Sequence, residues 1–107
     1  MPARYMARIA DGMLTEALAT GGAVQVKGPK WCGKTATSLQ QAASVVYLQD
    51  PDRSASYLAL ADAKPSALLE GRVPRLIDEW QMAPQLWDAV RFAVDLRGEP
   101  GQFVLTG

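Results

Sequence analysis

The sequence predicts an α/β fold in which helices cover both faces of a parallel sheet, and four strands of that sheet lie in this chain. Four short runs favour β-structure, at residues 23–27, 45–48, 75–78 and 102–106, and segments of helical periodicity separate them. Strands that alternate with helices form parallel sheets, because each crossover helix returns the chain to the same end of the sheet. Right-handed crossovers then give a doubly wound α/β sandwich. Polar residues at the ends of these runs predict a site at the carboxyl edge of the sheet.

Helices are expected over residues 4–19, 35–43, 53–62 and from Pro84 to Gly98, with one further helical turn at 67–69. Gly21 and Gly22 end the first helix. Asp52 is expected to cap the third, and Pro84 suits the first position of the last. The run at 45–48 is apolar throughout, so we expect it to be covered on both faces.

The composition is that of one small globular domain over residues 1–107. Hydrophobic residues make up 49% of the chain and charged residues 21%. Lys plus Arg equals Asp plus Glu at 11 each, and this zero net charge argues against a dedicated nucleic-acid surface. The single cysteine forms no intrachain disulfide, and no run is long and apolar enough to span a membrane. We therefore expect a cytoplasmic protein.

The octapeptide Gly28-Pro29-Lys30-Trp31-Cys32-Gly33-Lys34-Thr35 fits the phosphate-binding loop (P-loop) pattern G-x-x-x-x-G-K-[ST] at every fixed position. Its glycines let the backbone bend so that N–H groups surround phosphate oxygens. Lys34 supplies charge for the terminal phosphates, and the Thr35 hydroxyl is suited to ligate Mg²⁺. The predicted nucleotide-binding residues are Gly28, Lys30, Trp31, Cys32, Gly33, Lys34, Thr35 and Ala36. The competing interpretation is a glycine-rich turn that binds nothing.

A second group of candidates follows the third and fourth strands. Asp78 is suited to hold the Mg²⁺ shell through a water, and Glu79, pointing in another direction, to polarise the attacking water. Catalysis is thus assigned to Glu79 and Lys34, and the metal to Thr35 and Asp78. Thr106, at a strand end, is suited to sense the γ-phosphate through its hydroxyl. Alternatively, Asp78-Glu79 is an acidic turn and Thr106 a β-favouring residue at a strand terminus.

Other candidates have structural explanations beside functional ones. Cys32 is either sensitive to oxidation or a small filler of the loop. Trp31 either shields the phosphates, faces a partner or is a partly buried aromatic, and Lys30 either adds charge near the phosphates or is solvated. Packing or surface roles are expected for Trp80, Trp87, Arg91 and Arg97.

With these residues, the chain resembles the N-terminal ATPase domain of AAA-like ATPases of the AAA_14 type, which in full-length members precedes a C-terminal domain of the DUF4143 type. The matching segments are 28–35, 75–81, 86–91 and 101–107, in the order of the family. The resemblance implies ATP binding and hydrolysis, with a Walker A loop at 28–35, Asp78 and Glu79 as the Walker B pair and Thr106 as the sensor. It also implies that the strand at 23–27 neighbours the fourth strand, followed by the third and the second.

Members of this family are several times longer, so the resemblance implies a P-loop domain truncated after its fourth strand. The strand that would flank residues 23–27 is then missing, and this open edge invites self-association or a partner chain. Three hypotheses follow: an ATPase core that uses ATP and Mg²⁺, a non-catalytic module that pairs with a partner chain, or a small-molecule kinase. The Asp78-Glu79 pair favours activation of water over phosphorylation of an acceptor molecule, which argues against the kinase. The balanced charge gives nucleic-acid binding no support.

Overall fold

The computed structural model describes residues 3–26 and 34–107, and within these the side chains of residues 12–26 and 38–107. Its elements are, in order, α1 (Ala3–Thr20), β1 (Ala23–Val26), α2 (Lys34–Gln41), β2 (Ser44–Tyr47), α3 (Ser54–Ala63), η2 (Pro65–Leu69), β3 (Arg75–Asp78), η3 (Trp80–Met82), α4 (Leu86–Arg97) and β4 (Phe103–Thr106), where η marks a 3-10 helix. Each predicted helix and strand is present, and η3 is an additional element.

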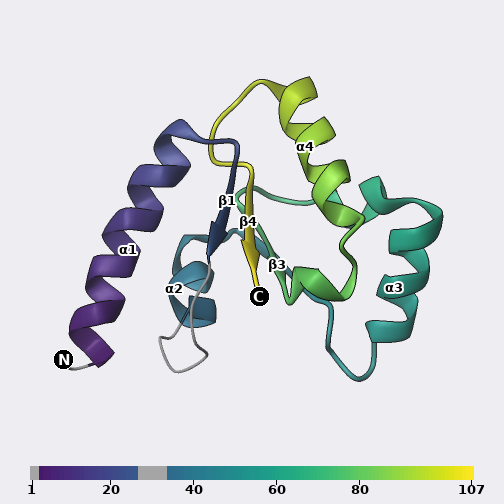
Figure 1. Cartoon of the computed structure of the whole chain (residues 1–107), viewed down its shortest axis with the longest axis horizontal. Helices are drawn as coiled ribbons and strands as arrows, with labels where there is room; N and C mark the ends of the chain where they lie inside the picture. Colours follow the sequence, from purple (N-terminus) through teal and green to yellow (C-terminus); the bar gives the residue numbers. More distant parts are fainter. Residues whose placement is uncertain (1–2, 27–33) are drawn as a thin grey trace.

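The strands form one parallel sheet in the order β1-β4-β3-β2. The last strand of the chain, β4, is inserted between β1 and β3, so that Val104 pairs with Val24 on one side and Leu76 on the other. In Figure 1, β1 and β4 run side by side in the same direction. These features confirm the predicted α/β fold class and the strand order implied by the resemblance. Among the described residues, β1 and β2 are the edge strands.

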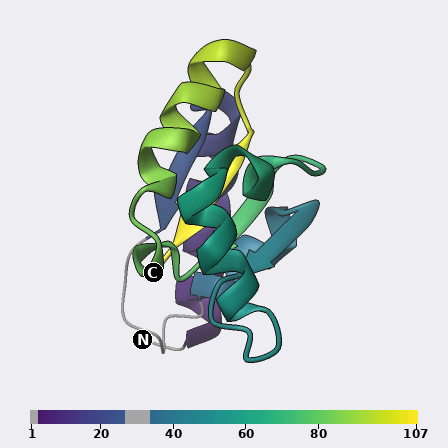
Figure 2. The same ribbon diagram turned by 90° about the vertical axis from the view of Figure 1, so that its right-hand side faces the viewer.

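Helices cover both faces of the sheet (Figures 1 and 2). On one face, Leu14 and Leu18 of α1 pack with Leu76 and Val104, and α2 lies against α1. On the other face, α3, η2 and α4 enclose a larger core whose buried members are Val46, Leu48, Ala61, Leu68, Leu69, Ile77, Ala83, Leu86, Val90, Phe103 and Leu105. Neighbouring residues of a strand point to opposite faces, so the central strands place apolar side chains in both cores: Leu76 and Val104 on one face, and Ile77, Phe103 and Leu105 on the other.

The start of α3 differs from the prediction, because Asp52 does not cap this helix. Arg53 occupies the N-cap position without a side-chain hydrogen bond. The carboxylate of Asp50 instead accepts the Asp52 N–H at 3.0 Å, and the Asp50 carbonyl accepts the Ser54 N–H at 2.7 Å. Asp50 therefore supplies the acceptors before α3: its side chain closes an Asx turn with Asp52, and its carbonyl accepts the first N–H of the helix.

Two further local predictions need correction. α4 begins at Leu86, because Pro84 belongs to the preceding turn, in which its carbonyl accepts the Trp87 N–H at 3.0 Å. The second strand is not covered on both faces along its length, since Tyr47 is 37% exposed at this edge of the sheet while Val46 is buried.

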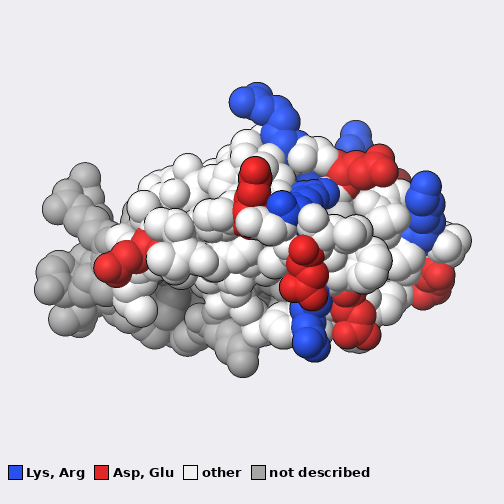
Figure 3. Space-filling view, turned by 90° about the horizontal axis from the view of Figure 1, so that it is seen from above, with Lys and Arg blue, Asp and Glu red and all other residues white. Residues whose placement is uncertain are grey.

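The surface of the described residues shows mixed charge. In the view of Figure 3, basic and acidic side chains are interspersed, and neither sign forms a continuous area on this face. None of the helices within residues 3–26 and 34–107 combines the length and apolar character needed to cross a bilayer.

Candidate functional site

Two predicted site residues meet where the central strands end. Asp78 is the last residue of β3 and Thr106 the last of β4, and the register of the parallel ladder pairs them directly. By strand alternation, their side chains share the face of Leu76 and Val104, which is the face that α1 and α2 cover. The strand packing thus directs a carboxylate and a hydroxyl toward α2, which contacts both strands.

The Asp78 and Thr106 side chains are joined by a short hydrogen bond. The Thr106 hydroxyl donates to Oδ1 of Asp78 at 2.6 Å, while Thr106 is 0% and Asp78 5% exposed. Burial away from water makes such a contact costly to break, because the oxygen would lose a donor that water cannot readily replace. The hydrogen bond therefore fixes the orientation of the Asp78 carboxylate.

Glu79 follows Asp78 in an unusual backbone conformation. It has φ 57° and ψ 44°, and it is the one non-glycine residue with positive φ among residues 3–26 and 34–107. The left-handed region costs a residue with a Cβ about 1–2 kcal/mol. The turn that it starts is closed by the Met82 N–H, which donates to the Glu79 carbonyl at 3.0 Å. The turn after β3 thus begins at Glu79 itself, and the separate direction and role expected for its carboxylate stay predictions.

Gln81 lies beside Glu79, and we did not predict a role for it from the sequence. Its side-chain Nε2 donates to Oε2 of Glu79. Its Oε1 lies against Gly107, at a place that a Cβ on Gly107 would occupy. The only sequence signal was a polar residue two positions after Glu79, and this signal becomes meaningful only with the left-handed backbone that brings the two side chains together.

The predicted phosphate loop is described only in part. Lys34, Thr35 and Ala36 form the first turn of α2, of which the structure gives the backbone. The predicted residues Gly28, Lys30, Trp31, Cys32 and Gly33 lie outside the described residues. Because α2 packs against β3 and β4, it belongs to the same structural unit as Asp78 and Thr106. The positive end of a helix dipole favours an anion at this position.

The sensor role of Thr106 stays a prediction, and the structure defines what it requires. Phosphate oxygens are acceptors, so a hydroxyl that senses them must donate its proton. In this structure that proton is donated to Asp78. A sensing Thr106 would therefore have to exchange its Asp78 acceptor for a phosphate oxygen.

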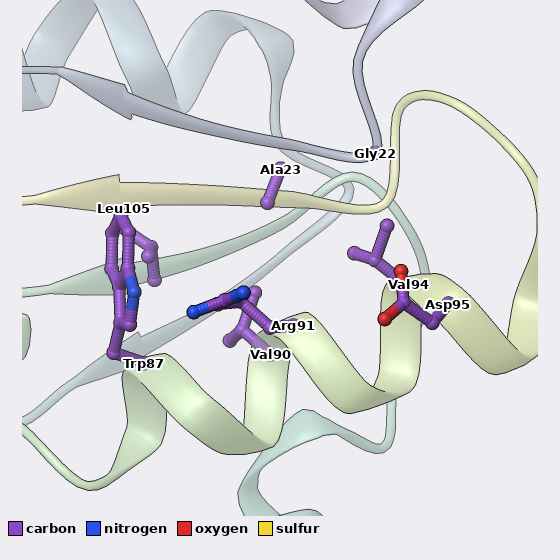
Figure 4. A pocket seen from close by; sticks show the side chains of 8 residues that line it. All are labelled: Gly22, Ala23, Trp87, Val90, Arg91, Val94, Asp95 and Leu105. Carbon is purple, nitrogen blue, oxygen red and sulfur yellow. The ribbon is translucent and has the colours of Figure 1, made fainter.

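A hollow of about 360 Å³ lies between α4 and the β1–β4 pair. Figure 4 shows the Trp87 ring beside Leu105, with Arg91 extended between the helix and the strands. Leu105 and Thr106 are neighbours in one strand, so this hollow opens on the sheet face opposite to Asp78 and Thr106. The hollow is thus distinct from the predicted site. The packing roles predicted for Trp80 and Trp87 agree with the contact of their rings, whose centres lie 5.3 Å apart.

Arg97 lies at the surface, as expected, but it has two contacts that the prediction did not include. Its Nη1 donates to Oε1 of Gln102 at 3.1 Å, and its guanidinium lies 5.0 Å from the centre of the Phe103 ring. These contacts tie the end of α4 to the start of β4 and engage the arginine structurally.

One comparison with known proteins agrees with the resemblance. The family model AAA_14, described as an AAA domain, matches residues 20–107, so the family indicated by the sequence is confirmed. No curated protein and no solved structure matches the chain. The match indicates a nucleotide-binding, ATPase-like function.

Proposed function

The chain belongs to the AAA_14 family of AAA domains, and on that basis we propose that it binds ATP together with Mg²⁺ and hydrolyses it slowly. The observation that carries the proposal is the meeting of distant segments at one edge of the sheet. Asp78 and Thr106 end adjacent strands on the face covered by α2, and α2 begins with the Lys34 and Thr35 of the phosphate-loop pattern. An anion bound at the start of α2 would then share this edge of the sheet with a carboxylate suited to a metal, as phosphoryl transfer needs.

In the proposed reaction, a water oxygen attacks the γ-phosphorus of ATP. The bond from this phosphorus to the β–γ bridging oxygen breaks, and ADP leaves with the bonding electrons. Glu79 accepts the proton that the water gives up, and Lys34 offsets negative charge on the terminal phosphates. Phosphate is released as the second product.

The donor chemistry of the chain fits Mg²⁺. Carboxylate and hydroxyl oxygens are the ligands this ion prefers, and Asp78 and Thr35 would hold it, directly or through water. The Asp78 carboxylate is held in one orientation by Thr106, which suits a metal-positioning group. Bound Mg²⁺ supplies charge neutralisation at the γ-phosphate. Residues with described side chains contain no group of three or more His, Cys, Asp or Glu suited to a metal, but phosphates and waters complete the shell in sites of this kind.

Calorimetry tests the binding step. We expect the parent chain to bind ATP in the presence of Mg²⁺, and Lys34→Ala to weaken binding by more than about tenfold, because a charge-assisted contact to phosphate is lost. The matched control is Lys64→Ala, which removes an exposed lysine after the end of α3 and should leave binding unchanged. Equal affinity of the parent and Lys34→Ala would contradict the proposal.

Phosphate release tests the chemical step. Glu79→Gln should bind ATP like the parent and lose turnover by about a hundredfold, since a positioned general base contributes about 10²–10⁴ in rate. Glu70→Gln changes the same side chain at an exposed position next to η2 and should keep the parent rate. Full turnover in Glu79→Gln would remove Glu79 from the mechanism.

The second candidate function is a non-catalytic module that pairs with another chain through β1. This strand has one strand neighbour, β4, among the described residues. The Phe103 N–H donates to the Gly22 carbonyl at 3.0 Å, so Gly22 and, by alternation, Val24 direct their peptide groups to β4. Ala23 and Gln25 then direct theirs to the open edge, where another strand of this or a different chain could pair.

Sedimentation velocity over a range of concentrations tests this second candidate. Self-association through the edge should be present in the parent, lost in Gln25→Pro, which lacks the outward N–H, and kept in the control Gln25→Ala. Proline is tolerated at such an edge position, so Gln25→Pro should still fold. A parent chain that stays monomeric at high concentration would speak against this candidate.

A further inference from the structure

The turn after β3 holds a contact that the proposed mechanism does not use. Glu79 carries the carboxylate assigned to water activation, and its backbone lies in the left-handed region. The two turn hydrogen bonds, from Met82 N–H to Glu79 carbonyl and from Ala83 N–H to Trp80 carbonyl, close this segment tightly. The Glu79 side chain therefore starts from a well-defined backbone, but it is itself only half-buried.

The Gln81 amide is engaged at both of its ends. Its Nε2 donates to Oε2 of Glu79, and its Oε1 lies against the Cα side of Gly107, where any Cβ would overlap it. Gln81 is exposed as a residue, yet its amide is located between the turn after β3 and the end of β4. An exposed glutamine without such contacts would be free to adopt many rotamers.

We propose that Gln81 is the positioning residue of the water-activating step: seated on Gly107, its amide holds the Glu79 carboxylate in the orientation needed to accept the proton. This inference rests on the proposed function, because it assigns a partner to the proposed general base. The half-buried Glu79 carboxylate can turn about three side-chain bonds, and the chemical step slows whenever it leaves the reactive geometry. A hydrogen-bond donor at one of its oxygens restricts that motion. Gln81 itself touches neither water nor nucleotide in this scheme.

The main test compares two glutamine–carboxylate contacts in the same chain. Gln81→Ala should lower kcat by about tenfold while the affinity for MgATP stays within about twofold, because positioning affects the chemical step and not ground-state binding. The matched control is Gln85→Ala, since Gln85 donates to Asp62 at 2.7 Å in an exposed contact between α4 and α3. Gln85→Ala should change neither quantity, and an unchanged kcat in Gln81→Ala would overturn the proposal.

Three further variants separate positioning from a structural role. Gln81→Glu keeps the length but replaces the donor by a like charge, so its kcat should fall at least as far as that of Gln81→Ala. Gly107→Ala does not change residue 81, but the added Cβ would overlap the Gln81 amide and displace it, so this variant should reproduce the kcat loss of Gln81→Ala. In a Glu79→Gln background, Gln81→Ala should cause no further loss, because it acts through Glu79. Additive losses in the double variant would contradict the proposal.

The outcome is distinguishable from failure of the proposed function. A parent chain that hydrolyses ATP, depends on Glu79 and ignores Gln81→Ala refutes the positioning role alone. A parent chain without turnover refutes the catalytic function. The contact between Gln81 and Glu79 is then tested without nucleotide, by the NMR resonances of the Gln81 side-chain amide. Glu79→Ala should shift these resonances and the control Asp88→Ala should not; unshifted resonances in Glu79→Ala would overturn the contact itself.

Discussion

The hydrogen bond from Thr106 to Asp78 should contribute substantially to the stability of the fold. Thr106→Val keeps the β-branched shape of a fully buried side chain and removes the hydroxyl that donates at 2.6 Å. A hydrogen bond to a buried carboxylate contributes about 1.5–3 kcal/mol, and the similar size of valine adds no cavity. We therefore expect a loss of about 2 kcal/mol in the free energy of unfolding and, for a domain of this size, a fall in Tm of roughly 10 °C.

Urea unfolding, followed by tryptophan fluorescence, measures this loss. The control Thr106→Ser keeps the donor and removes one methyl group, so it should cost only about 1 kcal/mol. In an Asp78→Asn background the cost of Thr106→Val should shrink, because the acceptor has lost its charge. The reasoning is refuted if Thr106→Val is as stable as the parent, because the contact would then make no net contribution to folding.

Two other substitutions test the packing that supports the site. Arg75 donates from Nε to the Leu68 carbonyl at 2.7 Å and from Nη1 to Oγ of Ser44 at 3.0 Å, and its partial burial lowers the pKa of the guanidinium. Because a lysine at this position cannot make both contacts, Arg75→Lys should lower the free energy of unfolding by about 1–2 kcal/mol, measured in urea. A Cβ on Gly22 would overlap the Val94 side chain, so Gly22→Ala should lose about 1–3 kcal/mol, and adding Val94→Ala should recover part of that loss if the clash is the cause.

The strands that carry the site were predictable because of where they lie. β3 and β4 are central, and a strand buried on both faces appears in the sequence as an unbroken apolar run with a polar residue where it leaves the sheet. Asp78 and Thr106 were identified by that change from apolar to polar. Their pairing was not predictable from the pattern, because hydrophobic periodicity does not specify which strands are neighbours; the resemblance supplied the order.

The contacts that the sequence did not predict depend on single backbone conformations. Nothing in the residue preferences of Glu79 indicates a left-handed conformation, and without it Gln81 has no reason to meet this carboxylate. Asp50 and Asp52 flank one proline and are equally suited as helix-capping side chains, so only the geometry of the turn selects Asp50. The geometry of each turn selects these contacts, and neither composition nor hydrophobic periodicity reports that geometry.

The end of β4 orients both members of the carboxylate pair. Thr106 donates to Asp78, and the next residue, Gly107, seats the glutamine that holds Glu79. Since β4 comes last in the chain but lies between β1 and β3, neither contact exists until this strand has docked into the middle of the sheet. The Asp78–Thr106 and Glu79–Gln81–Gly107 contacts are therefore formed by the same step that places β4 between β1 and β3. A ligand that needs both carboxylates in place can bind only the folded chain, and its binding free energy adds to the stability of the fold.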